Sequence, residues 1–383
     1  MIERRGYRLN HSDDHIKKKE KVCFLIPGMD AGGIENYLLR FLQFHDDRNW
    51  SCTVIARNEK TGDLTKEYEK LNVKIRYQGV GYANPIKWYK LYQHFKSESY
   101  DTICDFNGNF GGIPMVLGKL AGITNRIVFY RRSSRAYELT VLRVFYDNCL
   151  NKLVSTFSTK ILSNSQHALN VFFENGATYN GQFKIIPNGI NLESFRTKYS
   201  KEEARQKMDI QLNAYVLGHV GRFDPAKNHK MIFAVAAELT KVIPNIRFIF
   251  CGKGTDGDEF IEATQTYGIK DRCHFLGLQD DIPMVLKTMD LFYFPSVTEG
   301  QPNALIEAMI MGIPILASQI PSICEIIPEK FHDDILIDPN DVSASVKKIM
   351  DIYTMRFEQV SLEEFMKRKF NANKNFKLFE NEL

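Results

Sequence analysis

Short apolar runs rich in Val, Ile and Phe alternate with longer amphipathic stretches along the whole chain. Apolar strands separated by helical stretches are typical of parallel sheets whose faces are covered by crossover helices. The sequence therefore predicts an α/β fold with two series of strands. We expect the first series at residues 22–26, 52–56, 73–77, 102–104, 127–130, 160–163 and 184–186, and the second at 215–220, 247–251, 274–276, 291–294, 315–317 and 335–337.

The length of 383 residues indicates two domains, because a single hydrophobic core stops growing near about 250–300 residues. Pro187, Asn188 and Gly189 interrupt the pattern between the two series, and a charged stretch follows them. We place the linker near residues 190–200. The expected organisation is an N-terminal domain over 1–195, a C-terminal domain over 196–360, and a C-terminal helix over 361–383 that packs back towards the N-terminal domain.

Composition narrows the class of protein. The net charge of +4 is far below that of typical proteins that bind duplex nucleic acid, so we expect no nucleic-acid partner. Seven scattered cysteines form no CxxC pair, which favours reduced thiols in a cytoplasmic protein. The first 20 residues lack the apolar stretch of a signal peptide, and no run of 18 apolar residues occurs. We therefore expect neither export by that route nor a membrane span.

A glycine-rich turn follows the first predicted strand, with Gly28, Gly32 and Gly33 before an amphipathic helix. Glycines allow backbone N–H groups to approach an anion, and a helix N-terminus carries partial positive charge. A phosphate could bind here. The spacing is not GxGxxG, however, and turn geometry alone explains the glycines equally well.

The second series opens in a similar way. Its first strand ends at Gly221, and Arg222 and Lys227 flank a turn at Pro225. Ligands of open α/β sheets bind beyond the carboxyl ends of the strands, where two cations could hold a diphosphate. The alternative is a solvated surface pair.

The strongest local signal lies in the segment EGQPNALIEAMIMGIPILA, residues 299–317. Pro302 is suited to open a short helix. Glu307 is the only ionisable residue between Ala304 and Ala317, so it is expected to be buried. A buried carboxylate needs a partner, either ligand hydroxyls or neighbouring backbone N–H groups. Glu299 lies in the loop before the helix, where it could meet a polyhydroxy ligand.

Two glutamates separated by seven residues, within EGQPNALIE, resemble the signature of glycosyltransferase family 4, whose members are retaining nucleotide-sugar glycosyltransferases. The segments GGIEN, PNGIN, GRFDPAKN, FIFCGKGTD and HFLGLQDD occur in the order found in that family. The resemblance thus covers nearly the whole chain. It implies the GT-B fold, in which two Rossmann-like domains face each other across a cleft, with the sugar donor on the C-terminal domain and the acceptor on the N-terminal domain.

The resemblance also implies roles for individual residues. Arg222 and Lys227 would neutralise the donor diphosphate, Glu307 would accept the ribose hydroxyls, and Glu299 would contact the donor sugar. Members of this type use neither metal nor cofactor, and the sequence shows no convincing DxD loop or His/Cys cluster. The complete set of expected donor-binding residues is Gly32, Gly33, Arg222, Lys227, Gly277, Glu299, Gly300, Gln301, Pro302, Asn303, Ala304 and Glu307.

One position departs from the family pattern. Many relatives carry a histidine after the strand that here reads RIVFY, whereas this chain has Arg131 and Arg132. If the donor sugar is attacked from its front face, a donor phosphate oxygen can take the acceptor proton. Arg131 or Arg132 would then stabilise the leaving group or an anionic acceptor, so we count both as catalytic candidates with Glu299, Arg222 and Lys227.

The acceptor side is less defined. Asn107 and Asn109, in the turn CDFNGNFGG, could bond sugar hydroxyls, but a glycine-rich turn without a ligand is an equal alternative. The segment IKWYKLYQHFK, residues 86–96, has the composition of a helix at a membrane surface beside a lipid-linked acceptor. Packing of its aromatic residues on the sheet is the favoured alternative.

These observations predict a retaining glycosyltransferase that moves a sugar from a UDP- or GDP-sugar to a saccharide acceptor. Its products would be cell-surface polysaccharides or lipid-linked glycans, made in the cytoplasm or at the inner face of the membrane with peripheral association. A sugar-nucleotide epimerase of GT-B shape and a non-catalytic nucleotide- or carbohydrate-binding module remain alternatives. A nicotinamide-dependent dehydrogenase is disfavoured because the first turn lacks GxGxxG.

Overall fold

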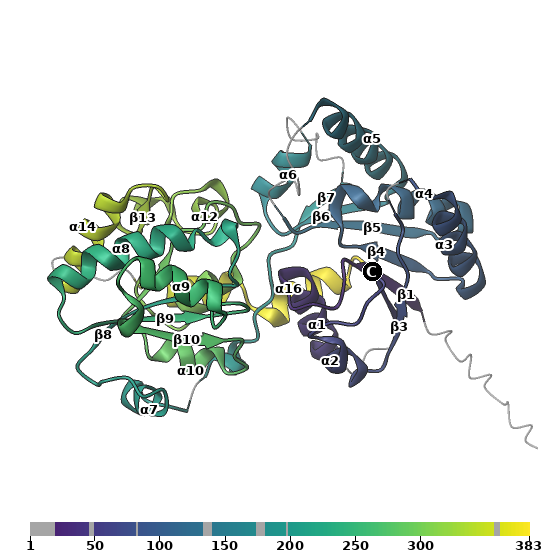
Figure 1. The fold of residues 1–383 in the computed structure, drawn as a ribbon. Helices are drawn as coiled ribbons and strands as arrows, with labels where there is room; N and C mark the ends of the chain where they lie inside the picture. Colours follow the sequence, from purple (N-terminus) through teal and green to yellow (C-terminus); the bar gives the residue numbers. More distant parts are fainter. Residues whose placement is uncertain are drawn as a thin grey trace, which may run out of the picture.

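The computed structural model describes residues 20–45, 50–81, 83–132, 140–173, 181–196, 198–355 and 361–383, and the statements below concern these residues. The chain forms two Rossmann-like α/β units, each built around one parallel sheet (Figure 1). All thirteen predicted strands are present, and their ends differ from the predicted ones by two residues at most.

The N-terminal sheet has the strand order β3-β2-β1-β4-β5-β6-β7, and all neighbouring strands are parallel. Its strands are β1 Lys21–Ile26, β2 Ser51–Ala56, β3 Val73–Tyr77, β4 Thr102–Asp105, β5 Asn125–Tyr130, β6 Lys160–Ser163 and β7 Phe183–Ile185. Its helices are α1 Gly33–Phe44, α2 Thr65–Glu69, α3 Pro85–Glu98, η1 Gly108–Gly111, α4 Gly112–Ala121, α5 Val141–Phe157 and α6 Gln166–Phe172.

The C-terminal sheet repeats this design with the order β10-β9-β8-β11-β12-β13. Its strands are β8 Tyr215–Val220, β9 Ile246–Cys251, β10 Cys273–Gly277, β11 Leu291–Phe294, β12 Ile315–Ser318 and β13 Leu336–Ile337. The accompanying helices are η2 Leu192–Phe195, α7 Lys201–Lys207, η3 Pro225–Lys227, α8 His229–Val242, α9 Asp258–Thr266, η4 Lys270–Arg272, α10 Ile282–Lys287, α11 Asn303–Ile310, α12 Pro321–Cys324, η5 Glu329–Phe331, α13 His332–Ile335 and α14 Val342–Tyr353.

Burial explains why the apolar runs form central strands. In β1 every residue after Lys21 is buried, and β11 is buried throughout. Side chains on the two faces of each sheet pack into separate cores, as expected for strands covered by helices on both sides. The carboxyl ends of the strands are left for loops, which is where the candidate site residues lie.

The C-terminal tail forms two helices rather than the single helix predicted over 361–383. Helix α15, Glu363–Lys369, packs in the C-terminal domain through Met366, whereas α16, Ala372–Glu380, inserts Phe376 and Phe379 into the N-terminal core. Between them, Asn371 pairs with Ile190 of the outgoing chain. The two connections between the domains therefore run side by side (Figure 1).

In the described part of the chain, no helix is both long enough and apolar enough to span a bilayer. The first 19 residues, which entered the signal-peptide argument, lie outside this part. All seven cysteines are free thiols. Helix α3 contains the aromatic segment 86–96, and it buries Leu91 and Phe95 while Ile86 and Tyr89 stay exposed.

Candidate active site

Each sheet has one switch point, where the strand order reverses. In the N-terminal sheet β1 lies beside β4, and in the C-terminal sheet β8 lies beside β11. Connections on the two sides of such a point leave in opposite directions and open a crevice at the carboxyl ends of the strands. The loops after β1, β4, β8 and β11 are therefore where ligand-binding residues are expected.

The switch point of the C-terminal sheet brings together three of the predicted donor residues. Lys227 follows β8, Glu299 follows β11, and their Nζ and Oε1 atoms are 2.5 Å apart in a partly buried ion pair. The Val297 N–H donates to the Ala226 carbonyl at 2.9 Å and joins the two loops. Arg222 also follows β8, but its side chain is largely exposed and bonds Asp224 at 3.2 Å.

Helix α11 places Glu307 in the protein interior, with 4% of the residue exposed. Its partner in this structure is a side chain that the sequence analysis did not consider. Arg40, on α1 of the other domain, donates from both Nη1 and Nη2 to Oε1 of Glu307 at 3.0 Å. Because Arg40 uses only Oε1 in these bonds, it orients the carboxylate without occupying Oε2.

The start of α11 is open to an anion. Pro302 is the N-cap residue, and no side chain caps the helix, so its first N–H groups have no partner from a cap. The helix begins at Asn303, one residue after the predicted start, and Ala304 is its second residue. The backbone at this end therefore suits the predicted contact with a diphosphate.

The loop before α11 also contacts the N-terminal domain. A Cβ at Gly300 would overlap the carbonyl oxygen of Arg131, so only glycine allows the loops after β5 and β11 to approach this closely. The side chains of Gln301 and Asn303 both bond Asn188. These two side chains connect the domains, whereas the donor contacts predicted for this segment come from the backbone N–H groups of residues 300–303.

The structure separates the two arginines that follow β5. Arg131 is 9% exposed, stacks at 3.4 Å over the ring of Tyr37, and donates to Asn188 Oδ1 at 2.5 Å. Burial lowers the pKa of Arg131 to about 10. Arg132, in contrast, lines an open pocket. Arg131 thus holds the domain junction, while Arg132 contributes to the lining of the pocket.

The glycine turn after β1 contains a carboxylate that the sequence analysis did not single out. Gly32 is the N-cap of α1, and Gly33 has open space where a side chain would stand. Glu35, in the first turn of α1, is buried, and burial raises the pKa of its carboxyl group. The positive charges of Arg222 and Arg132 lower this pKa and so oppose the effect of burial. The turn therefore faces cations from both domains.

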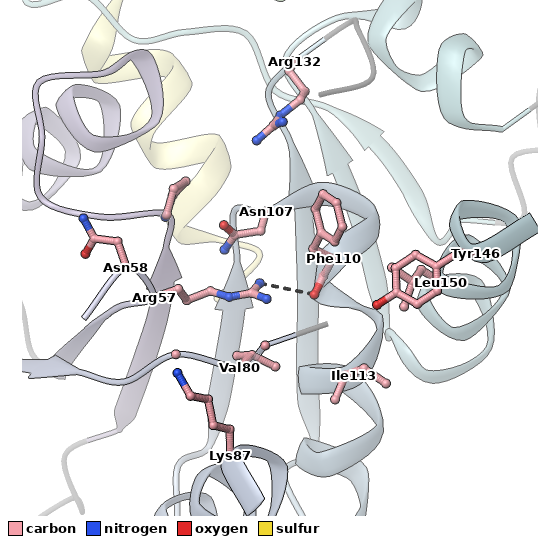
Figure 2. A pocket seen from close by; sticks show the side chains of 13 residues that line it. Arg57, Asn58, Val80, Lys87, Asn107, Phe110, Ile113, Arg132, Tyr146 and Leu150 are labelled. Atoms are coloured by element: carbon pink, nitrogen blue, oxygen red, sulfur yellow. Dashed lines mark hydrogen bonds between the residues drawn. The ribbon is translucent and has the colours of Figure 1, made fainter. Parts of the chain in front are cut away.

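A cavity of about 410 Å³ lies at the carboxyl edge of the N-terminal sheet (Figure 2). Arg57 follows β2, Asn107 follows β4 and Arg132 follows β5, while Lys87 enters from α3. Figure 2 shows Arg57, Lys87 and Arg132 entering the same space from different sides. The lining is completed by Pro27, Asn58, Gly79, Val80, Gly81, Phe110, Ile113, Tyr146 and Leu150.

The two predicted acceptor residues differ in position. Asn107 lines the cavity, although its Nδ2 donates to Asp105 at 2.8 Å. Asn109 does not line it, and its Nδ2 donates to Asp147 at 2.8 Å. The last predicted donor residue, Gly277, ends β10 with φ of +59° and lies away from the β8–β11 switch point, since β9 separates β10 from β8.

Comparisons with known proteins agree with this geometry. Residues 200–369 match the family model "Glycosyl transferases group 1". The UDP-Gal:α-D-GlcNAc-diphosphoundecaprenol α-1,3-galactosyltransferase of Escherichia coli is 26% identical over 68% of both chains. The capsular polysaccharide biosynthesis glycosyltransferase CapH of Staphylococcus aureus is 27% identical over 86% of this chain and 90% of its own. The Anabaena HepE structure with UDP-glucose superposes with a TM-score of 0.77 at 19% identity, over 94% of this chain and 98% of that one.

Two facing Rossmann-like units, with the paired glutamates at the second switch point, define the GT-B class of glycosyltransferases. The chain is similar to the group 1 glycosyltransferases, and residues 200–369, in its C-terminal domain, carry the family match.

Several residues at the site escaped the sequence analysis. Arg40 is one of several polar residues on an amphipathic helix, and Arg57 follows a strand without a local motif. Asn188 lies between Pro187 and Gly189, where the sequence indicates only a turn. Only the spatial neighbourhood reveals them. No group of three His, Cys, Asp or Glu side chains that could hold a metal occurs among the residues that the structure describes.

Proposed function

We propose that this protein transfers a hexose from a UDP-sugar to a saccharide acceptor with retention of the anomeric configuration. The observation that carries the proposal is the Lys227–Glu299 ion pair at the β8–β11 switch point, followed by the buried Glu307 on α11, all within the region of the family match. UDP is favoured over GDP because the E. coli relative is named for UDP-Gal and the HepE structure holds UDP-glucose.

In this proposal the donor lies along the start of α11. Lys227 and Arg222 counter the diphosphate charge, and the uncapped N–H groups of α11 add hydrogen bonds. Glu307, oriented by Arg40, accepts the ribose hydroxyls through Oε2. Glu299 gives up its ion pair with Lys227, which then binds the diphosphate. Glu299 instead accepts a hydrogen bond from a hydroxyl group of the sugar.

The proposed reaction breaks the bond between the anomeric carbon and the diphosphate oxygen and forms one to the acceptor oxygen on the same face. The acceptor proton passes to the departing diphosphate, so no protein base is needed. Fixed positive charge at the leaving group lowers the barrier because negative charge develops there. We propose that the reaction needs neither a metal nor a cofactor.

For the acceptor, we propose a saccharide of a polysaccharide or lipid-linked glycan pathway, used at the cytoplasmic face of the membrane. The support is the name of the E. coli relative, whose acceptor is a diphosphoundecaprenol-linked sugar, and the capsular role in the name of CapH.

Thermal stabilisation by nucleotides tests the donor assignment. Ligands that bind only the native state raise Tm by mass action, so UDP and UDP-hexoses should raise it while GDP should not. Glu307→Ala should remove the shift. If no nucleotide raises Tm of the wild type, the donor assignment is wrong. Donor binding without transfer or slow hydrolysis would indicate a binding module, and interconversion of free UDP-sugars an epimerase.

The stereochemical and metal proposals have a separate test. The product formed from a UDP-α-hexose should carry an α linkage by NMR, and EDTA should leave the rate unchanged. A β-linked product would overturn retention, and loss of activity in EDTA, restored by a divalent cation, would overturn metal independence.

A further inference from the structure

Two aromatic rings hold the buried guanidinium of Arg131. Its central carbon lies 3.4 Å from the ring centroid of Tyr37 and 5.0 Å from that of Phe129. The face of an aromatic ring attracts a cation, most strongly where water is excluded. Both rings belong to the hydrophobic core of the N-terminal domain, so the core fixes where the guanidinium stands.

The side chain of Arg131 makes its polar contact with Asn188. Its Nη2 atom donates to Oδ1 of Asn188 at 2.5 Å. The Nε and Nη1 atoms are buried, and neither bonds any residue in the part of the chain that the structure describes. The guanidinium can therefore influence the other domain through the amide group of Asn188.

Asn188 is buried and connects three separate segments to Arg131. Its Nδ2 donates to Oδ1 of Asn303, its N–H donates to Oε1 of Gln301 at 2.6 Å, and its carbonyl accepts from Nδ2 of Asn375 at 2.9 Å. A guanidinium only donates hydrogen bonds, so the atom of the Asn188 amide that faces Arg131 must be the oxygen. The nitrogen of that amide is then directed at Asn303.

The contacts of Asn188 fix the start of α11. Asn303 is the first residue of this helix, and no side chain caps it. Gln301, in the loop just before, also donates from Nε2 to the Asn164 carbonyl of the N-terminal domain at 2.9 Å. The N-terminal domain therefore holds the end of the helix that the proposed function places against the donor diphosphate.

We propose that Arg131 is a positioning residue for the start of α11 and that it acts through Asn188 rather than on the substrate. The guanidinium orients the amide of Asn188, and this amide orients Asn303, so that the first N–H groups of α11 face the diphosphate. The identity of that ligand rests on the proposed function. The role differs from the direct contact with the leaving group that the sequence analysis considered for Arg131.

Amide hydrogen exchange tests this role without any ligand. The Ile306 N–H donates to the Pro302 carbonyl at 3.1 Å, so its exchange reports opening at the start of α11. Arg131→Met, whose unbranched side chain can pack on Tyr37 but cannot donate, should raise this exchange several-fold, the effect of losing one hydrogen bond. Arg131→Lys should restore part of the protection, because lysine can still donate to Oδ1 of Asn188.

Arg126→Met is the matched control. Arg126 lies towards the other end of β5 and bonds the carbonyls of Phe157 and Ile123, so its loss should leave the exchange of Ile306 unchanged. Wild-type exchange in Arg131→Met would overturn the inference, and so would an equal rise in both variants. If Arg131→Met does not fold, Arg131→Lys takes its place, with a smaller rise expected and no rise contradicting the inference.

Titration with UDP shows whether Arg131 acts through Asn188. Arg131→Met and Asn188→Ala should each bind UDP several-fold more weakly than the wild type. The double variant should bind no more weakly than Asn188→Ala, because the effect of Arg131 is already lost in that variant. Independent, multiplying losses would indicate a direct contact between Arg131 and the diphosphate and would overturn the inference. Absence of UDP binding by the wild type would instead contradict the proposed function, and the exchange of Ile306 would still decide the role of Arg131.

Discussion

The two domains share one architecture but differ in the charges at their switch points. At the C-terminal switch point, acids and bases neutralise each other in pairs, Lys227 with Glu299 and Glu307 with Arg40. At the N-terminal switch point, three cations line an open cavity that has no carboxylate in its lining, and Asp105 and Glu59 pair with two of them from behind. The same strand order can thus carry different side chains at the carboxyl ends of its strands, where the position of a site follows from the strand ends and its chemistry from the loops.

The largest effect is expected at the C-terminal switch point. Lys227→Ala removes a fixed positive charge at the proposed leaving group, and turnover should fall by about 10²–10³-fold, as when one preorganised donor is lost. Lys230→Ala, an exposed lysine three residues further, should leave turnover unchanged. Steady-state rates with a UDP-sugar measure both variants. Turnover of Lys227→Ala within twofold of wild type would show that Lys227 has no catalytic role.

The next largest effect is expected at the contact between the two domains. Gly300→Ala places a methyl group against the Arg131 carbonyl and pushes the loops after β5 and β11 apart. A misplacement of about 1 Å can cost about 100-fold in rate, so we expect kcat to fall between tenfold and a hundredfold.

The control for this variant is Gly257→Ala, where the nearest atom is 3.5 Å from the added methyl group. It should behave as wild type. If Gly300→Ala also retains the wild-type kcat, close approach of these loops is not required for transfer.

A smaller effect distinguishes Glu307 from its partner. Arg40→Ala leaves the Glu307 carboxylate in place but removes the hydrogen bonds that orient it, so this variant should bind UDP several-fold more weakly than the wild type. Glu307→Gln should bind UDP far more weakly still. Calorimetric titration with UDP measures both constants. Tighter UDP binding by Arg40→Ala would mean that Arg40 competes with the nucleotide rather than positioning the carboxylate.

The smallest effect concerns the stability of the C-terminal domain, which should depend on pH. Burial, reinforced by Lys227, lowers the pKa of His229 in the C-terminal domain from 6.5 to about 4. Between these values the unfolded chain takes up a proton that the folded domain excludes, so stability is lost as pH falls. The loss should be about 2 kcal/mol at pH 5.

Replacing the titrating ring tests this assignment. His229→Phe keeps an aromatic ring among Phe223, Phe233 and Phe260. Its free energy of unfolding, from urea titrations at pH 7 and pH 5, should depend less on pH than that of the wild type. The same pH dependence in both proteins would contradict the prediction.

The sequence predicts the framework of this molecule better than its contacts. Strand positions follow from apolar runs, and the cluster around Glu299 and Glu307 follows from one continuous motif, because local sequence determines both. The partner of Glu307 could not be predicted, since Arg40 lies on another domain and no periodicity relates the two. The cationic cavity is equally hidden, because Arg57, Lys87 and Arg132 come from three separate elements that only the parallel sheet brings together.

The C-terminal tail, residues 361–383, shows the same limit of prediction from sequence. Its apolar residues predict a helix, but they do not show that the break before Ala372 sends α15 and α16 to different cores. Asn371 caps α16 and pairs with Ile190, and this long-range pairing fixes the break.

A crystal structure of the complex with UDP would test the division of roles between the two switch points most directly. The account predicts UDP at the β8–β11 switch point, with its ribose on Glu307 and its diphosphate beside Lys227 and the start of α11. UDP bound instead in the cavity among Arg57, Lys87 and Arg132 would contradict the assignment of both domains.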